Sequence, residues 1–200
     1  DLSIEACARD LASVQRAVGA ESAVILGHSM GCQVALEHYR QSPEKVAGLV
    51  LMLGSAGRVL DTFFDTPQSV HVHRILKDLV WRFGPGSRHL VRALFCAPWA
   101  WSLTRRARMV DPHYTTREDF SPYLSHLARL DPRLFLEMVG QAHLHDAFDL
   151  LPRISVPALV VAGERDSFTP LSISRRMASE IPGADLLVLA DGSHAAIIEH

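Results

Sequence analysis

Residues 24–33 read VILGHSMGCQ, and this stretch decides the fold of the chain. Its apolar start belongs to a predicted strand at 23–26, and residues 30–41 have the pattern of a helix. Between them stands the motif G-x-S-x-G, with Ser29 flanked by Gly27 and Gly31. A serine in so sharp a turn has a strained backbone and an outward-pointing hydroxyl, and the glycines leave room where helix and strand crowd together. The motif predicts a nucleophilic serine; the alternative is a glycine-rich turn with an idle serine.

The segments around this motif alternate between helix and strand. Residues 3–18 and 172–181 carry apolar side chains at steps of three and four, which predicts a helix in each case. Further apolar runs, typical of parallel strands buried on both faces, occur at residues 46–53, 158–162 and 186–189. This alternation predicts an α/β fold with a parallel sheet flanked by helices.

The middle of the chain differs, because no strand-like run occurs between about residues 57 and 151. Helical spacing recurs there instead, and Asp131-Pro132 is a typical helix start, with the cap on the aspartate and proline in the first turn. The region therefore predicts an all-helical lid inserted between two strands. The chain then divides into a first core part at 1–56, a lid or cap insertion at 57–151 and a second core part at 152–200.

A neutral serine is a poor nucleophile and needs a base, which in turn needs an orienting acid. Asp166 follows the predicted strand at 158–162, and His194 follows the predicted strand at 186–189. Because the carboxyl ends of parallel strands meet at one edge of a sheet, we expect both side chains where Ser29 emerges. The order serine, acid, histidine is also the one that accompanies this motif after a strand.

Three stretches resemble the α/β-hydrolase superfamily, in its serine esterase and lipase branch: VILGHSMG at 24–31, VPALVVAGERD at 156–166 and GSHAAIIEH at 192–200. The resemblance extends over nearly the whole chain and is least specific in the lid region. It implies Ser29 as nucleophile, Asp166 as acid and His194 as base, with the Met30 N–H as one oxyanion donor. It also implies a partial α/β-hydrolase sheet and the hydrolysis of a small or medium acyl ester through an acyl-enzyme, without a cofactor.

Several neighbours of these residues have competing interpretations. Glu164 is the alternative acid, but the family pattern G-x-x-D favours Asp166. Asp191 reads as a turn residue before a glycine. His28 is expected to pack or to shape the pocket, and Cys32 is expected to be a small packed thiol and not a second nucleophile.

Other activities of the same superfamily remain open at this point. Carbon–carbon bond hydrolases and acyltransferases use the same serine, acid and histidine. A non-catalytic ligand-binding protein on the same fold is a further alternative, because a fold does not fix a function.

Members of the superfamily usually have several strands before the first helix seen here, and a loop after one of them supplies a second oxyanion donor. No such strand precedes Ser3, and the sequence ends six residues after His194. We therefore expect a fragment of a longer enzyme, without the N-terminal strands and the extreme C-terminus. By itself it is expected to be insoluble or nearly inactive, because an uncovered apolar edge strand favours aggregation and one lost oxyanion donor costs about a hundred- to a thousand-fold in rate.

Composition excludes other classes of protein. The net charge is −2, which gives no overall attraction for nucleic acid. The longest apolar run, at residues 46–53, is too short to cross a bilayer. No secretory signal is visible at Asp1, so we expect a cytoplasmic protein whose partner is a small acyl substrate. The strong preference for arginine over lysine indicates GC-rich, bacterial coding.

Two histidine pairs look at first like metal ligands. His71 and His73 stand two residues apart, as do His143 and His145. Residues at this spacing on a helix point to different faces, so we expect solvated or core histidines and no metal. The three cysteines show no metal-like spacing either.

Overall fold

The computed structural model describes residues 1–63, 66, 68–97, 99–106 and 109–199. Within this part, four strands form one parallel sheet whose spatial order is their order in the chain: β1 (Ala23–His28), β2 (Val46–Met52), β3 (Ala158–Gly163) and β4 (Asp185–Leu189). The predicted α/β class and its parallel sheet are confirmed. The predicted strand ends differ from the observed ones by at most two residues.

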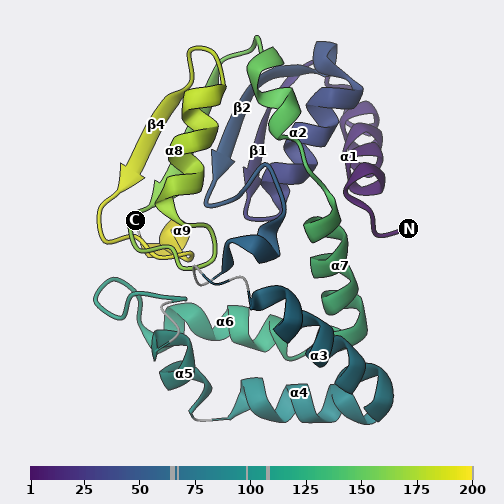
Figure 1. Ribbon diagram of the computed structural model, residues 1–200, viewed down its shortest axis with the longest axis vertical. Helices are drawn as coiled ribbons and strands as arrows, with labels where there is room; N and C mark the ends of the chain where they lie inside the picture. The colour runs from purple at the N-terminus through teal and green to yellow at the C-terminus, as the bar shows by residue number, and fades with distance from the viewer. Residues whose placement is uncertain (64–65, 67, 98, 107–108, 200) are drawn as a thin grey trace.

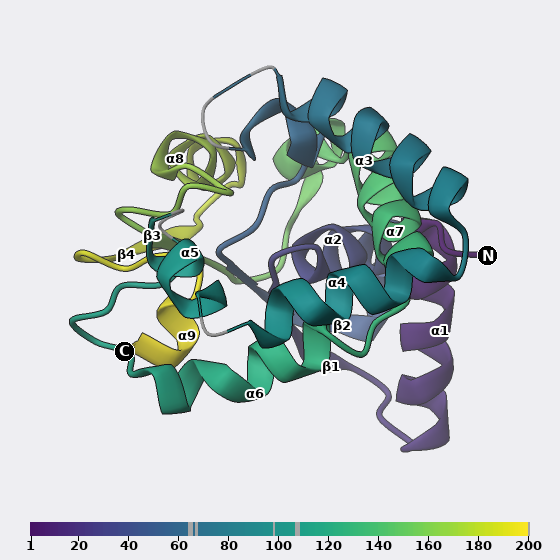
Figure 2. The ribbon, with the colours of Figure 1, turned by 90° about the horizontal axis from the view of Figure 1, so that it is seen from below.

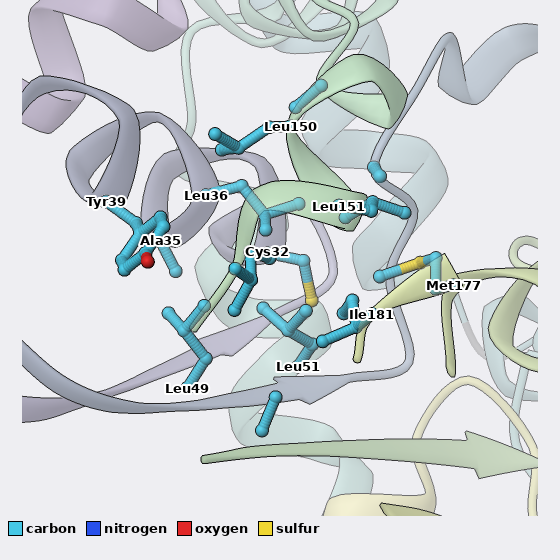
Figure 3. Packing of buried hydrophobic residues seen from close by; sticks show 14 of the residues in the cluster. Cys32, Ala35, Leu36, Tyr39, Leu49, Leu51, Leu150, Leu151, Met177 and Ile181 are labelled. Atoms are coloured by element: carbon cyan, nitrogen blue, oxygen red, sulfur yellow. The ribbon is translucent and has the colours of Figure 1, made fainter. Parts of the chain in front are cut away.

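Helices cover one face of this sheet. The helices α2 (Gly31–Gln41) and α8 (Leu171–Glu180) lie against the strands, and α1 (Ile4–Ala17) packs on α2 (Figure 1). The short helix η4 (Phe148–Arg153) fills the space between α2 and α8 (Figure 3). The core between these elements consists of buried side chains, and those of Cys32, Leu36, Leu51, Leu151 and Met177 are at most 1% exposed.

The opposite side of the edge strands is exposed in the described part of the chain. Val24 and Leu26 of β1 are each 63% exposed, and Leu187 of β4 is 47% exposed. The exposure of Val24 and Leu26 agrees with the uncovered apolar edge strand expected at residues 23–26. The prediction that the strand at 186–189 is buried on both faces is wrong for β4. A continuous apolar run shows that both faces of a strand can be covered, but it does not show that they are.

The first helix begins and ends as its sequence predicts. The Ser3 side chain accepts a hydrogen bond from the N–H of Ala6, which caps the first turn. Gly19 follows the helix with a φ of 71°, a left-handed conformation that stops it. The Asp131 side chain caps a later helix in the same way, with Pro132 in the first turn.

Between β2 and β3 the described residues form helices and no strand. The major ones are α3 (Ser69–Phe83), α4 (Gly86–Cys96), α5 (Ala100–Arg106), α6 (Arg117–Leu127) and α7 (Pro132–Leu144). They gather beside the carboxyl ends of the strands (Figure 1). Seen from below, α4 joins the packed pair α3 and α7 to α6 (Figure 2). A short helix, α9 (Ala196–Glu199), follows β4 and also lies beside the carboxyl ends of the strands (Figure 1).

One buried side chain joins the start and the end of this helical insertion. Gln33 of α2 is 0% exposed, and its Nε2 donates to the carbonyl oxygens of Gly57 at 3.0 Å and Ala142 at 2.7 Å. The chain enters the insertion near the first of these residues and leaves it near the second. The insertion is thus anchored to the helix that follows Ser29.

A membrane-spanning role finds no support in these helices. Within the described ranges, none combines the length and the apolar content that a bilayer requires.

Candidate active site

Ser29 stands at the tip of the turn between β1 and α2. Its φ of 55° is a left-handed conformation, which is strained for a residue with a side chain. Two backbone bonds hold the turn: the Ser29 N–H donates to Met52 at 2.9 Å, and the Cys32 N–H donates to the Ser29 carbonyl at 3.0 Å. The turn therefore fixes where the hydroxyl points.

The two glycines of the motif have different roles. A Cβ at Gly27 would lie less than 3.0 Å from the backbone of Gly31, so strand and helix can approach only if residue 27 has no side chain. A Cβ at Gly31 would meet nothing within 4 Å. The expectation that crowding requires both glycines is correct for Gly27 and wrong for Gly31.

A third glycine, in the loop after β2, packs against this turn and was not predicted from the sequence. A Cβ at Gly54 would lie less than 3.0 Å from the Cys32 sulfur and from the Ser29 carbonyl oxygen. Its place directly after a buried strand was the available signal, since glycine there often marks close approach of another backbone.

Ser29, His194 and Asp166 form a hydrogen-bonded chain. The His194 Nε2 lies 3.0 Å from the Ser29 Oγ, and its Nδ1 lies 2.9 Å from the Asp166 Oδ2. The three side chains follow β1, β4 and β3, respectively, at the edge of the sheet where these strands end. The structure thus brings together all three residues that the sequence singles out.

Asp166 is 5% exposed, and its carboxylate accepts hydrogen bonds from several donors. Its Oδ1 accepts from the N–H groups of Phe168 at 2.8 Å and Thr169 at 3.0 Å. Its Oδ2 accepts from the Thr169 hydroxyl at 2.7 Å besides the His194 ring. These contacts fix the carboxylate so that one oxygen faces the imidazole. The role of Thr169 was not predicted from the sequence, although its spacing of three from Asp166 is typical of a local side-chain turn.

The alternative acid, Glu164, has a different partner. Its Oε2 accepts from the N–H of Asp191 at 3.1 Å on the exposed surface. Asp191 adopts a φ of 58° in a turn, as predicted, and its carboxylate pairs with Arg165. The structure therefore brings Asp166, and not Glu164, to His194.

Close packing keeps the acid loop and the histidine loop together. A Cβ at Gly163 would lie less than 3.0 Å from the carbonyl oxygens of Gly192 and Ser193. The N–H of Arg165 donates to Gly192 at 2.9 Å across the same junction. The distance between Asp166 and His194 is thus set by backbone contact as well as by their own hydrogen bond.

Two neighbours of the serine differ in their chemistry. Burial, and next repulsion from His194 when its ring is protonated, lower the pKa of His28, whose ring lies 5.5 Å from that of His194. This position agrees with a packing role. Burial raises the pKa of the Cys32 thiol to about 12, and its Sγ donates to the Gly27 carbonyl at 3.2 Å. Cys32 is therefore a packed thiol and not a second nucleophile.

The N–H of Met30 faces no hydrogen-bond acceptor among the described residues. Because it directly follows the serine, this donor is available to a ligand at Ser29. No second such donor is evident from the described part of the chain.

Two apolar clusters extend from the serine and the histidine into the helical insertion. One includes Met30, together with Val59, Leu60, Phe63 and Val139. The other includes Ala195, together with Trp101, Val110, Phe120 and Leu124. The residues that directly follow Ser29 and His194 thus each pack against apolar side chains of the insertion.

The histidine pairs have separate protein partners. His73 donates to the Leu136 carbonyl at 2.8 Å, His143 accepts from Arg58 at 3.1 Å, and His145 lies 3.2 Å from the Glu37 carboxylate. Among the described residues, no group of three or more potential ligands has metal-binding geometry.

Comparison with known proteins agrees with this architecture. The family described as alpha/beta hydrolase fold matches residues 1–200. A protein of Pseudomonas savastanoi pv. phaseolicola named as the carbamate hydrolase RutD is 27% identical over 99% of this chain and 70% of its own length. A 2-hydroxy-6-oxononadienedioate/2-hydroxy-6-oxononatrienedioate hydrolase of Klebsiella pneumoniae is 28% identical, over 96% of this chain and 63% of its own length.

Solved structures give the same result. A thermophilic esterase from Thermogutta terrifontis superposes with a TM-score of 0.72 at 28% identity, over 98% of this chain and 67% of that one. An esterase from Exiguobacterium antarcticum has the same TM-score at 19% identity, over 98% of this chain and 69% of that one, and supports the fold alone. The chain therefore belongs to the alpha/beta hydrolase family of enzymes.

Proposed function

We propose that the protein is a serine hydrolase that cleaves an acyl ester of a small or medium substrate. The observation that carries this proposal is the chain of two hydrogen bonds, from Ser29 through His194 to Asp166, at 3.0 and 2.9 Å. A serine that is bonded to an imidazole, with the imidazole oriented by a carboxylate, is an arrangement that activates a hydroxyl for acyl transfer.

In the proposed mechanism, His194 takes the Ser29 proton on Nε2 while the Ser29 oxygen attacks the substrate carbonyl. Asp166 holds the Nδ1–H and stabilises the positive charge of the ring. The Met30 N–H donates to the negative oxygen of the tetrahedral intermediate. His194 then gives its proton to the departing alcohol, which leaves an acyl group on Ser29. In the second half, His194 takes a proton from a water while the water oxygen attacks the acyl carbonyl. His194 then returns the proton to the Ser29 oxygen as the bond between that oxygen and the acyl group breaks, which releases the acid.

The helical insertion is proposed to be a lid over this site. In this division the core comprises residues 1–56 and 152–200, and the lid comprises 57–151. The bonds from Gln33 to Gly57 and Ala142 support this division, since the first lies at the start of the insertion and the second lies in its last α-helix, α7. The substrate would bind between the lid and the edge of the sheet that carries the triad.

The proposed ester has apolar groups on both sides of its carbonyl. The clusters that contain Met30 and Ala195 support this, because apolar surroundings favour apolar acyl and alcohol parts. The similarity to the Thermogutta terrifontis esterase points to the same class.

Carbamate cleavage is the second candidate, and the name of the Pseudomonas relative favours it. A carbamate carbonyl is attacked by the same triad, so the geometry supports both reactions. Carbon–carbon bond cleavage, which the name of the Klebsiella relative indicates for that protein, is a third outcome that the test should include.

Labelling with a fluorophosphonate probe tests the mechanism. Ser29 should displace the fluoride and become phosphonylated, and the Ser29→Ala variant should not react. A panel of p-nitrophenyl esters of increasing acyl length, an aryl carbamate and a dienoic ring-cleavage product then separates the substrate classes. Ester turnover well above carbamate turnover supports the first candidate. Absence of both labelling and turnover in the folded protein contradicts the triad mechanism.

A further inference from the structure

A second buried carboxylate lies next to the histidine loop and takes no part in the triad. Glu199, in α9, is 8% exposed. Its Oε2 accepts from the Ser193 N–H at 2.8 Å, and its Oε1 lies 2.6 Å from the Ser193 hydroxyl. Both donors belong to the residue that directly precedes His194.

The same carboxylate also binds the helical insertion. Its Oε1 accepts from the N–H of Asp111 at 2.6 Å, although the two residues are 88 positions apart. The Ser193 hydroxyl lies 3.1 Å from the carbonyl of Met109, in the same segment of the insertion. Glu199 and Ser193 therefore connect residues 109–111 to the histidine loop directly.

The loop on the other side of His194 depends on this network too. The N–H of Ala195 donates to the Ser193 hydroxyl oxygen at 3.0 Å. The residues before and after His194 are thus both tied to the Ser193 and Glu199 pair. Because a catalytic imidazole must stay within hydrogen-bond reach of its serine, whatever fixes its two neighbours fixes the base.

We propose that Glu199 is a positioning residue that couples the seating of the lid at residues 109–111 to the alignment of His194 with Ser29. When the lid segment docks, the Asp111 N–H adds a third donor to the carboxylate that holds the histidine loop. When it lifts, the carboxylate loses that donor and its burial, and the loop loses its support. The surface contact between Arg165 and Asp111, at 3.5 Å and half in solvent, adds little to this coupling.

The proposal rests on the proposed role of His194, and it requires more than a structural contribution from Glu199. A Glu199→Gln substitution keeps the size of the side chain. Its amide nitrogen, however, is a donor and cannot accept the hydrogen bonds that Ser193 and Asp111 donate to the carboxylate. We expect kcat to fall by about ten- to a hundred-fold with a KM within about two-fold, because a buried donor loses its acceptor next to the base and not at the substrate. The rate of phosphonate labelling of Ser29 should fall by a similar factor.

Hydrogen exchange followed by mass spectrometry tests the coupling without any activity measurement. In the Glu199→Gln variant, peptides that contain residues 109–112 and residues 193–196 should exchange faster together. Glu180→Gln is a matched control, since it makes the same chemical change in an exposed ion pair with Arg176. It should alter neither exchange nor kcat.

Ser193→Ala provides a second test that leaves Glu199 in place, in case Glu199→Gln does not fold. It removes the hydroxyl that bridges Glu199, Met109 and the Ala195 N–H, so kcat and labelling should fall while KM stays. Wild-type kcat in a folded Glu199→Gln protein, or in Ser193→Ala if the first variant is unfolded, would overturn the proposal. Faster exchange in only one of the two peptides would overturn the coupling. If Ser29 of the wild type does not react with the fluorophosphonate probe, the proposed function fails. The exchange experiment still decides whether residues 109–111 and the histidine loop are coupled.

Discussion

His194 Nε2 lies 3.0 Å from the Ser29 hydroxyl, although 165 positions separate the two residues in the chain. The parallel sheet brings the two residues together, because β1 and β4 run in the same direction. The loops that follow them, which carry Ser29 and His194, therefore lie at the same edge of the sheet. The two side chains are held by different means. Ser29 is fixed by its strained turn, whereas His194 is fixed by Asp166 on one side and by the network of Glu199 behind it.

Replacing either Ser29 or His194 by alanine should abolish turnover. Since the two side chains are proposed to act as one unit, each single change should lower kcat by up to the order of a million-fold, and the double change should cost little more. Ester turnover by the purified variants, with folding verified by circular dichroism, measures this. Additive losses would contradict a shared proton transfer.

Thr169→Val should lower kcat by about tenfold while the protein stays folded. The change removes the hydroxyl that donates to Asp166 Oδ2 at 2.7 Å, so the carboxylate that orients His194 loses one of its fixed donors. Thr169→Ser keeps the hydroxyl and should restore most of the rate. If valine and serine at this position turn over substrate equally fast, Thr169 does not position the acid.

Alanine at the two glycines of the G-x-S-x-G motif should have unequal effects. Gly27→Ala places a Cβ less than 3.0 Å from the backbone of Gly31, and we expect the free energy of unfolding to fall by about 3 kcal/mol or more. Gly31→Ala meets nothing within 4 Å and should change it by less than about 0.5 kcal/mol. Urea unfolding of both variants measures the two changes in the free energy of unfolding. Equal losses would show that Gly27 and Gly31 are equally crowded at the turn.

The positions of Ser29, Asp166 and His194 could be predicted because each follows an apolar strand and because parallel strands share one edge. Local patterns carry this information: an apolar run, a glycine and a chemically capable side chain. The helix starts at Ser3 and Asp131 were predictable for the same reason, since a cap acts over a few residues.

Thr169, Gly54 and Glu199 were not found, and the reasons differ. The contact of Thr169 with Asp166 is local and could have been read from their spacing. Gly54 is crowded by Cys32, and Glu199 meets Asp111, so both depend on segments that approach only in the folded chain. The exposure of Leu187 was missed because an apolar strand pattern is the same whether or not its face is covered.

Acid should destabilise the protein in part through His28. Burial, and next repulsion from a protonated His194, hold the pKa of His28 below its ordinary value of 6.5. Between the lowered pKa and 6.5 the unfolded chain therefore binds more protons than the folded one. The contribution of His28 to stability is therefore complete above pH 6.5 and is lost progressively as the pH falls below it. Urea unfolding at a series of pH values should show a smaller loss for His28→Gln than for the wild type. An equal loss in both would show that His28 does not contribute.

Gln33→Leu should loosen the attachment of the helical insertion. The change leaves the buried carbonyls of Gly57 and Ala142 without their donor, and we expect the free energy of unfolding to fall by about 2 kcal/mol or more. Gln41→Leu is the control on the same helix, because Gln41 is exposed and binds neither Gly57 nor Ala142. It loses a bond to the Glu37 Oε1 at 3.0 Å, so it should cost about 1 kcal/mol or less. Limited proteolysis should cleave the first variant faster near residues 57 and 142. If the cleavage pattern and the stability of both variants match the wild type, the insertion is held by its apolar contacts and not by Gln33.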